Sequence, residues 1–72
     1  ANSAEHANLS DALRTLSISV ASLRGALETS VRLRKDPNAS EMEQLIAEST
    51  TTVSQRRQEV QSATDALSYA VA

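Results

Sequence analysis

The sequence predicts an all-α fold, an antiparallel two-helix hairpin that we expect to complete a bundle by association. Its 72 residues include only one Gly and one Pro, so long stretches contain no helix-breaking residue. Apolar residues recur at helical spacing in both halves of the chain, and the single proline lies between these halves. We therefore expect one domain over 1–72, with a first helix over about 2–35, a turn over 36–40 and a second helix over about 41–71.

The first helix is predicted by an apolar pattern with alternating steps of four and three residues. This spacing is typical of a coiled-coil helix that packs along its whole length, and no alternation typical of a strand competes with it. The residues are Leu9, Leu13, Leu16, Val20, Leu23 and Leu27.

The second helix carries a sparser pattern, one apolar residue in every seven. Ile46, Val53, Val60 and Leu67 follow this spacing, which places them on one helix face. Because polar residues occupy the intervening positions, this helix offers about one strong apolar contact per heptad rather than two.

The segment between the helices has the residues of a turn. Asp36-Pro37 predicts the end of the first helix, because a proline disfavours helical geometry in the residue before it. Ser40 and Glu43 have the spacing of a capping box, which predicts the start of the second helix. Cations near the end of the first helix complement its dipole; they are Arg32, Arg34 and Lys35.

A reversal at Asp36-Pro37 brings apolar residues of the two helices to matching levels. The predicted pairs are Leu27 with Ile46, Val20 with Val53, Leu13 with Val60, and His6 with Leu67. An antiparallel hairpin accounts for this mirrored pattern, which two unrelated helices do not explain.

This register leaves part of the first helix without an apolar partner. Leu9, Leu16 and Leu23 would face polar residues of the second helix, so we expect them to bind a protein partner. Two further features are assigned to the same role. Ala21 and Gly25 belong to a stripe of small residues that permits close approach of another helix. Arg56 and Arg57 form a solvated pair or a polar layer that pairs with an acid such as Glu59 or Asp11.

Composition argues against several classes of function. The chain has no Cys and a single His, so we expect no metal or cofactor and no catalytic constellation, and therefore no enzyme. A net charge of −2 with one aromatic residue does not favour nucleic-acid binding. No apolar run is long enough to span a membrane, and no small-molecule substrate is indicated. We expect a soluble chain, cytoplasmic or exported without a visible cleavable signal.

The turn segment "KDPN", Lys35 to Asn38, and the stretch "RQEVQSAT", Arg57 to Thr64, carry a family resemblance. A cysteine-free and tryptophan-free helical hairpin with this turn resembles the needle subunits of bacterial type III secretion systems. Small helical partner proteins of those systems are similar at this level. The resemblance implies a helix–loop–helix subunit that polymerises helically. Ala39-Ser40 departs from the family pattern, which often has a second proline there.

The function predicted from these observations is non-enzymatic protein–protein assembly. One form is a self-associating structural subunit that packs through the leucine face of the first helix. The alternatives are an adaptor or small chaperone-like hairpin that binds a helix of another protein, and a filament subunit of the secretion-needle type.

Overall fold

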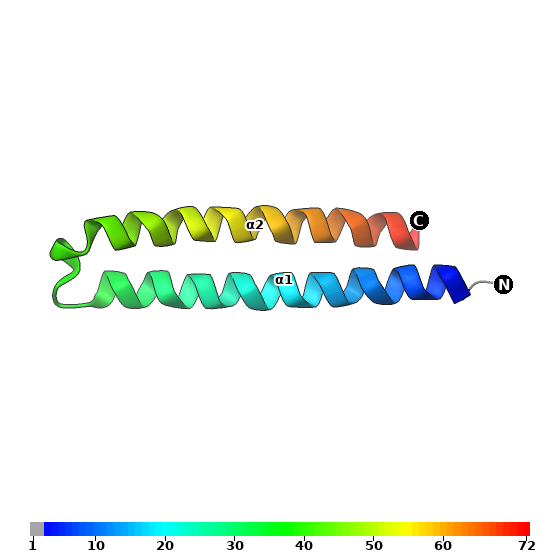
Figure 1. Cartoon of the computed structure of the whole chain (residues 1–72), viewed down its shortest axis with the longest axis horizontal. Helices are drawn as coiled ribbons and strands as arrows, with labels where there is room; N and C mark the ends of the chain where they lie inside the picture. The colour runs from blue at the N-terminus through cyan, green and yellow to red at the C-terminus, as the bar shows by residue number, and fades with distance from the viewer. Residues whose placement is uncertain (1–2) are drawn as a thin grey trace.

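The computed structural model describes residues 3–72, with side chains described from Asn8 onwards. Helix α1 spans Ser3–Lys35, a short 3₁₀ helix η1 spans Ala39–Glu41, and helix α2 spans Glu43–Val71. The two long helices lie side by side and run in opposite directions (Figure 1). The predicted all-α antiparallel hairpin is therefore confirmed. The predicted pairing of His6 with Leu67 concerns a side chain outside those that the structure describes.

The hairpin is a rod rather than a globule. Its extents are 59 × 13 × 12 Å, and its radius of gyration is 16.6 Å. A compact domain of this length has a radius of gyration of about 11 Å. Two parallel cylinders cannot enclose a central core, because each is covered on one side only.

The connection Asp36–Met42 is held by local hydrogen bonds. The Asp36 Oδ1 atom accepts a hydrogen bond from the Asn38 backbone N–H at 2.8 Å, and the Ala39 N–H donates to the Asp36 carbonyl at 3.0 Å. At the other end of η1, the Met42 N–H donates to the Ala39 carbonyl at 3.0 Å. These bonds tie the backbone from the end of α1 to the start of α2, so the connection is a built turn rather than a loose linker.

The predicted capping box is wrong. Ser40 lies inside η1 and is exposed, and Met42 occupies the N-cap position of α2. Within the described residues no side chain makes a capping hydrogen bond to α2. The 3₁₀ helix explains the difference, because it takes up the residues that the prediction assigned to the first turn of α2.

The contact between the helices is marked by positions that alternate in steps of three and four. Side chains at these positions are buried or partly buried, whereas most of their neighbours are exposed. We call this set the seam. On α1 it contains Leu9, Ala12, Leu16, Ser19, Leu23, Ala26, Ser30 and Leu33; on α2 it contains Ile46, Ser49, Val53, Arg56, Val60, Ala63 and Leu67.

The seam combines leucines with small and polar side chains, and it buries little. Ala63 is the most buried apolar residue, at 4% exposed, and Ser30 and Ser49 are 7% and 8% exposed. Among the side chains from Asn8 onwards, none is completely buried. The Ser49 hydroxyl donates to the Ile46 carbonyl at 2.7 Å, which satisfies it within its own helix. In the part of the hairpin whose side chains are described, the helices therefore share a contact line but no enclosed core.

The predicted pairing of Leu13 with Val60, Val20 with Val53 and Leu27 with Ile46 is also wrong. The seam uses the α2 residues of that prediction but a different stripe of α1. The prediction centred the reversal on Asp36-Pro37, whereas α1 ends at Lys35 and α2 begins at Glu43, which centres the connection on Ala39. This shift of the centre changes which α1 residues lie level with each residue of α2.

Candidate protein-binding surfaces

The three leucines predicted to bind a partner lie inside the hairpin contact. Leu9, Leu16 and Leu23 are partly buried seam residues, and they do not form an exposed face. The expectation that they are left uncovered by α2 is therefore wrong. In this structure they contribute apolar area to the contact between α1 and α2.

A different apolar stripe of α1 faces solvent. Leu13, Val20 and Leu27 are 51%, 49% and 39% exposed, and Val31 is 49% exposed. Their spacing of seven, seven and four residues places them along one side of α1. We call these four residues the leucine–valine stripe. It is an elongated apolar surface that the fold of a single chain leaves uncovered.

Arginines border this stripe. Leu27, Arg34 and Arg57 line the same shallow cleft between the helices, so both guanidinium groups lie on the flank that carries the stripe. The Arg34 Nη2 group donates a hydrogen bond to Thr50 Oγ1 at 2.8 Å, which links α1 to α2 close to the connection. Arg57 is exposed, as predicted for a solvated arginine. The flank is thus both apolar and basic.

The opposite flank is hollowed. An open hollow of about 680 Å³ lies between Thr15 and Ser19 of α1 and Ala63 and Ala66 of α2. A second hollow of about 220 Å³ adjoins Gly25. Thr29, which lines the second hollow, is two residues from Leu27 of the stripe. At roughly 100° per residue, these two positions are about 160° apart around α1. The hollows and the stripe therefore lie on opposite sides of the hairpin. We call the two hollows together the side groove.

The two named residues of the predicted small-residue stripe differ in their contact with the side groove. Gly25 lines the side groove together with Ser22 and Thr29, and a Cβ built on Gly25 meets no described atom within 4 Å outside its own helix turn. Ala21 is exposed and lies outside the lining of both hollows. The open space beside Gly25 agrees with close approach by another chain, while α2 does not use it.

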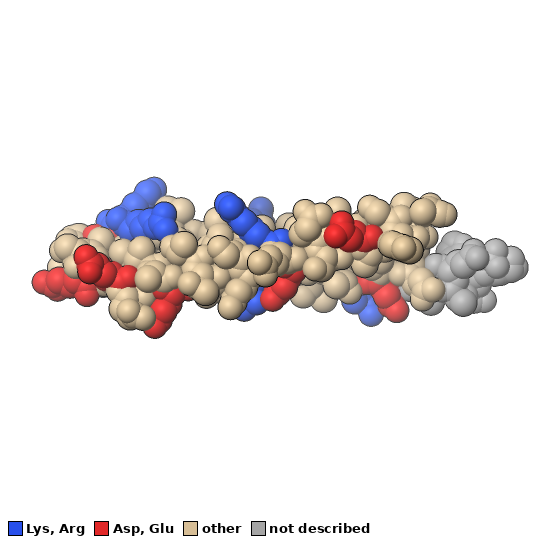
Figure 2. All heavy atoms as spheres, turned by 90° about the horizontal axis from the view of Figure 1, so that it is seen from above, with Lys and Arg blue, Asp and Glu red and all other residues tan. Residues whose placement is uncertain are grey.

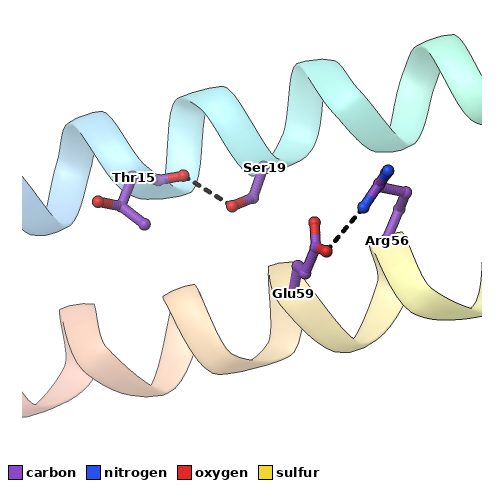
Figure 3. Close-up of polar contacts among 4 residues, drawn as sticks. All are labelled: Thr15, Ser19, Arg56 and Glu59. Carbon is purple, nitrogen blue, oxygen red and sulfur yellow. Dashed lines mark hydrogen bonds and ion pairs between the residues drawn. The ribbon is translucent and has the colours of Figure 1, made fainter.

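An ion pair lies along the α2 side of the side groove, between its two hollows. Arg56 Nη1 and Glu59 Oε2 are 2.7 Å apart, and their side chains are 34% and 51% exposed. Figure 3 shows both side chains extending from α2 into the space between the helices, near the hydrogen bond from Ser19 Oγ to the Thr15 carbonyl. Arg56 lines one hollow and Glu59 lines the other. This is the predicted pairing of Arg56 with Glu59. At this exposure it contributes at most a few tenths of a kcal/mol to stability.

Charges are unevenly distributed on the two sides of the hairpin. Figure 2 shows basic side chains along one edge next to the turn and acidic side chains along the other, while the acidic edge also carries a basic side chain towards the middle of the rod. Arg34 and Arg57 lie on the stripe flank, whereas Glu48, Glu59 and Arg56, the ion-pair partner of Glu59, line hollows of the other flank. The two flanks therefore differ in electrostatic potential as well as in shape.

Two other kinds of site have no counterpart in the part of the chain that the structure describes. Among the side chains from Asn8 onwards, no group of three His, Cys, Asp or Glu residues is placed to hold a metal ion. In the same range, neither helix has a stretch long and apolar enough to cross a bilayer. The polar groups that line the hollows are mainly hydroxyls and amides, such as Gln55 and Ser62, which are typical of solvated helix surfaces.

Comparison with family models, curated proteins and solved structures finds no match for this chain. The resemblance to secretion-needle subunits stays a prediction, based on the "KDPN" connection and the hairpin.

Sequence reasoning missed the leucine–valine stripe as a surface because it placed these residues in the contact between the helices. A signal was present in the residues beside them. Ala12, Ser19 and Ala26 follow the same heptad spacing next to Leu9, Leu16 and Leu23. Small side chains in this position let α2 approach the leucines on that side, whereas the bulkier stripe on the other side does not.

Proposed function

We propose that this chain is a non-enzymatic protein–protein assembly module, a structural subunit that associates with further copies of itself through the leucine–valine stripe. The observation that carries the proposal is the exposure of this stripe along two heptads of α1. Leu13, Val20, Leu27 and Val31 form one line of apolar surface, with exposed fractions from 39% to 51%. Association would remove this surface from water, which is favourable in proportion to its apolar area.

The total surface of the hairpin supports the same conclusion. Its accessible area is 5437 Å². A compact monomer of this mass exposes about 4,300 Å², so the hairpin carries an excess of about 1,100 Å². A standard protein–protein interface buries about 800 Å² on each partner. One ordinary interface per copy would therefore bring the exposed area to the level expected for a compact protein.

Self-association is preferred over a different partner because the chain itself offers complementary surfaces. The alternative is an adaptor that binds a helix of another protein. The open side groove favours this alternative, because a groove between two helices can accept a third helix. We also propose that α1 and α2 form an antiparallel coiled coil, because the seam alternates in steps of three and four. A filament subunit of the secretion-needle type is one form that such self-association would take.

The test is sedimentation velocity over a dilution series with three proteins. The stripe variant is Leu13→Gln/Val20→Gln/Leu27→Gln, in which glutamine keeps a high helix propensity. The control is Leu45→Gln/Val71→Gln, which removes two side chains that are 51% and 65% exposed. Both lie near the ends of α2, outside the stripe and outside the lining of the hollows.

We expect the wild type and the control to form concentration-dependent oligomers, and the stripe variant to stay monomeric with unchanged helical circular dichroism. The control separates a specific surface from general stickiness, because its side chains are at least as exposed as any in the stripe. A wild type that remains monomeric over the whole series would show that the proposal is wrong. A monomer that gains helicity and stability on titration with an amphipathic helical peptide would favour the adaptor instead.

A further inference from the structure

The two flanks of the hairpin are complementary to each other. The stripe flank projects bulky side chains, Leu13, Val20 and Leu27, and carries Arg34 and Arg57 at its border. The groove flank is recessed, and alanine, glycine, serine and threonine form much of its lining. A projecting apolar line and a recess lined by small side chains are the two halves of a helix-packing contact, in which ridges fill grooves.

The side groove is continuous enough to accept a helix surface. Gln55 lines both the larger hollow and a neighbouring open hollow of about 330 Å³, and Thr52 lines this neighbouring hollow and the one beside Gly25. The three hollows therefore adjoin one another along α2. On α1 the groove runs from Thr15 to Thr29, two heptads or about 21 Å at 1.5 Å per residue.

The stripe has a matching length. Leu13 to Leu27 also covers two heptads of α1, about 21 Å at the same rise per residue. Both features are straight, because each follows a continuous helix. The stripe of one copy can thus lie along the groove of a second copy without bending either hairpin.

Resting on the self-association proposed above, we propose that the copies join heterologously, with the leucine–valine stripe of one copy seated in the side groove of the next. Each copy then uses both flanks, one as the projecting surface and the other as the receiving surface. Such a contact does not close on itself in a two-fold dimer, so it produces a ring or an open chain of subunits.

Charge complementarity selects this arrangement over a two-fold contact of stripe with stripe. In a two-fold contact the same flank meets itself, and the Arg34 and Arg57 side chains of both copies border one interface. Like charges placed together oppose association. In the heterologous contact these arginines approach the groove flank, where Glu48 and the ion pair of Arg56 with Glu59 lie, a net charge of −1 for these three side chains. The separation of basic and acidic side chains next to the turn in Figure 2 is consistent with this pairing of unlike flanks.

The test uses two variants, each with one surface disabled. The stripe variant, Leu13→Gln/Val20→Gln/Leu27→Gln, keeps the groove. The groove variant is Gly25→Arg/Ala66→Arg, which places one long cation in each of the two main hollows and keeps the stripe. The open space beside Gly25 accepts the new side chain, and arginine has a higher helix propensity than glycine, so the hairpin should fold. Circular dichroism melts verify folding, and Gly25→Arg alone serves if the double variant melts early.

We expect each variant alone to be monomeric at a concentration at which the wild type assembles. An equimolar mixture of the two should form a heterodimer with one copy of each, seen by native mass spectrometry, and it should grow no further. This outcome is specific to a heterologous contact, because a two-fold stripe contact would require the stripe on both partners.

Two results would overturn the inference while leaving the proposed self-association intact. One is a folded groove variant that assembles like the wild type, and the other is a mixture that stays monomeric although the wild type assembles. A wild type that is monomeric at every concentration overturns the self-association itself and the heterologous contact with it.

Discussion

Leu16 and Leu13 form a matched pair that tests where α2 contacts α1. They are three residues apart on the same helix and carry the same side chain, but Leu16 is a partly buried seam residue whereas Leu13 is 51% exposed. We consider Leu16→Ala and Leu13→Ala. Both substitutions slightly raise helix propensity, so any difference between them reports contact with α2.

The expected magnitudes follow from burial. Complete burial of a leucine side chain is worth about 1.5–3 kcal/mol, so partial burial of Leu16 gives a loss of about 1–2 kcal/mol in the free energy of unfolding. For Leu13→Ala the loss is about 0.5 kcal/mol or less, because little contact is removed and alanine is a better helix former. A chain of this length has a total stability of about 4–11 kcal/mol, so the Leu16 effect is large.

The assay is urea and thermal unfolding followed by circular dichroism, at a concentration at which sedimentation shows monomers. We expect the midpoint of thermal unfolding to fall by roughly 4–16 °C for Leu16→Ala, at 4–8 °C per kcal/mol, and by a few degrees at most for Leu13→Ala. Equal losses, or a larger loss for Leu13→Ala, would refute the assignment of the seam and would favour the register first predicted from the sequence. The monomer condition matters, because association through the stripe would make Leu13 contribute to stability as well.

Two further substitutions test local features of the hairpin. Gly25→Ala should raise the free energy of unfolding by about 1 kcal/mol, because alanine is the better helix former and the new methyl group meets open space; a drop in the thermal midpoint would contradict this. Ser40→Ala should change stability by about 0.5 kcal/mol or less in urea unfolding, since Ser40 lies in η1 and caps nothing. A loss near 1 kcal/mol, the usual cost of removing an N-cap, would restore the capping box and contradict the structure.

The sequence was sufficient to predict the fold class because its helical signals are local. Few residues interrupt the helices, and Asp36-Pro37 marks the end of the first helix with a steric rule that acts within one peptide unit. The structure ends α1 at Lys35, directly before this pair. Local rules of this kind do not depend on which tertiary contacts form.

The register was not predictable in the same way because it depends on the length of the connection. The residues Ala39–Glu41 were assigned to the turn or to the second helix, whereas they form the 3₁₀ helix η1. Short 3₁₀ helices are frequent at the ends of α-helices, so η1 is hard to distinguish from the first turn of α2 by sequence alone. An error of a few residues at this point alters every pairing between α1 and α2.

The sequence predicted an exposed apolar stripe on α1, but it assigned the wrong residues to that stripe. Periodicity alone does not decide which of two stripes of α1 packs against α2, because each repeats every seven residues. One stripe is Leu9, Leu16 and Leu23, and the other is Leu13, Val20 and Leu27. Which stripe meets α2 depends on the bulk of the residues that flank it, and this is a property of the assembled pair of helices. Arg56, named together with Arg57 as a partner-binding residue, lies on the seam and pairs with Glu59 of its own helix, and its role towards a partner stays a prediction.

The hydrogen-bonded connection Asp36–Met42 also determines the order in which this hairpin can form. The entropy cost of closing a loop rises with the logarithm of its length, so the contacts of Leu33 with α2 close the shortest loop and form at the lowest entropy cost. Once they exist, each further level of the seam adds residues adjacent to those already ordered, and no second loop is closed. Contacts near the open end join residues that are far apart in sequence, but they form at low further cost once the levels nearer to the turn are ordered. We therefore expect the chain reversal at Ala39 to act as the folding nucleus, and the open end, near Leu67, to be the last part of the hairpin to be ordered and the first to be released.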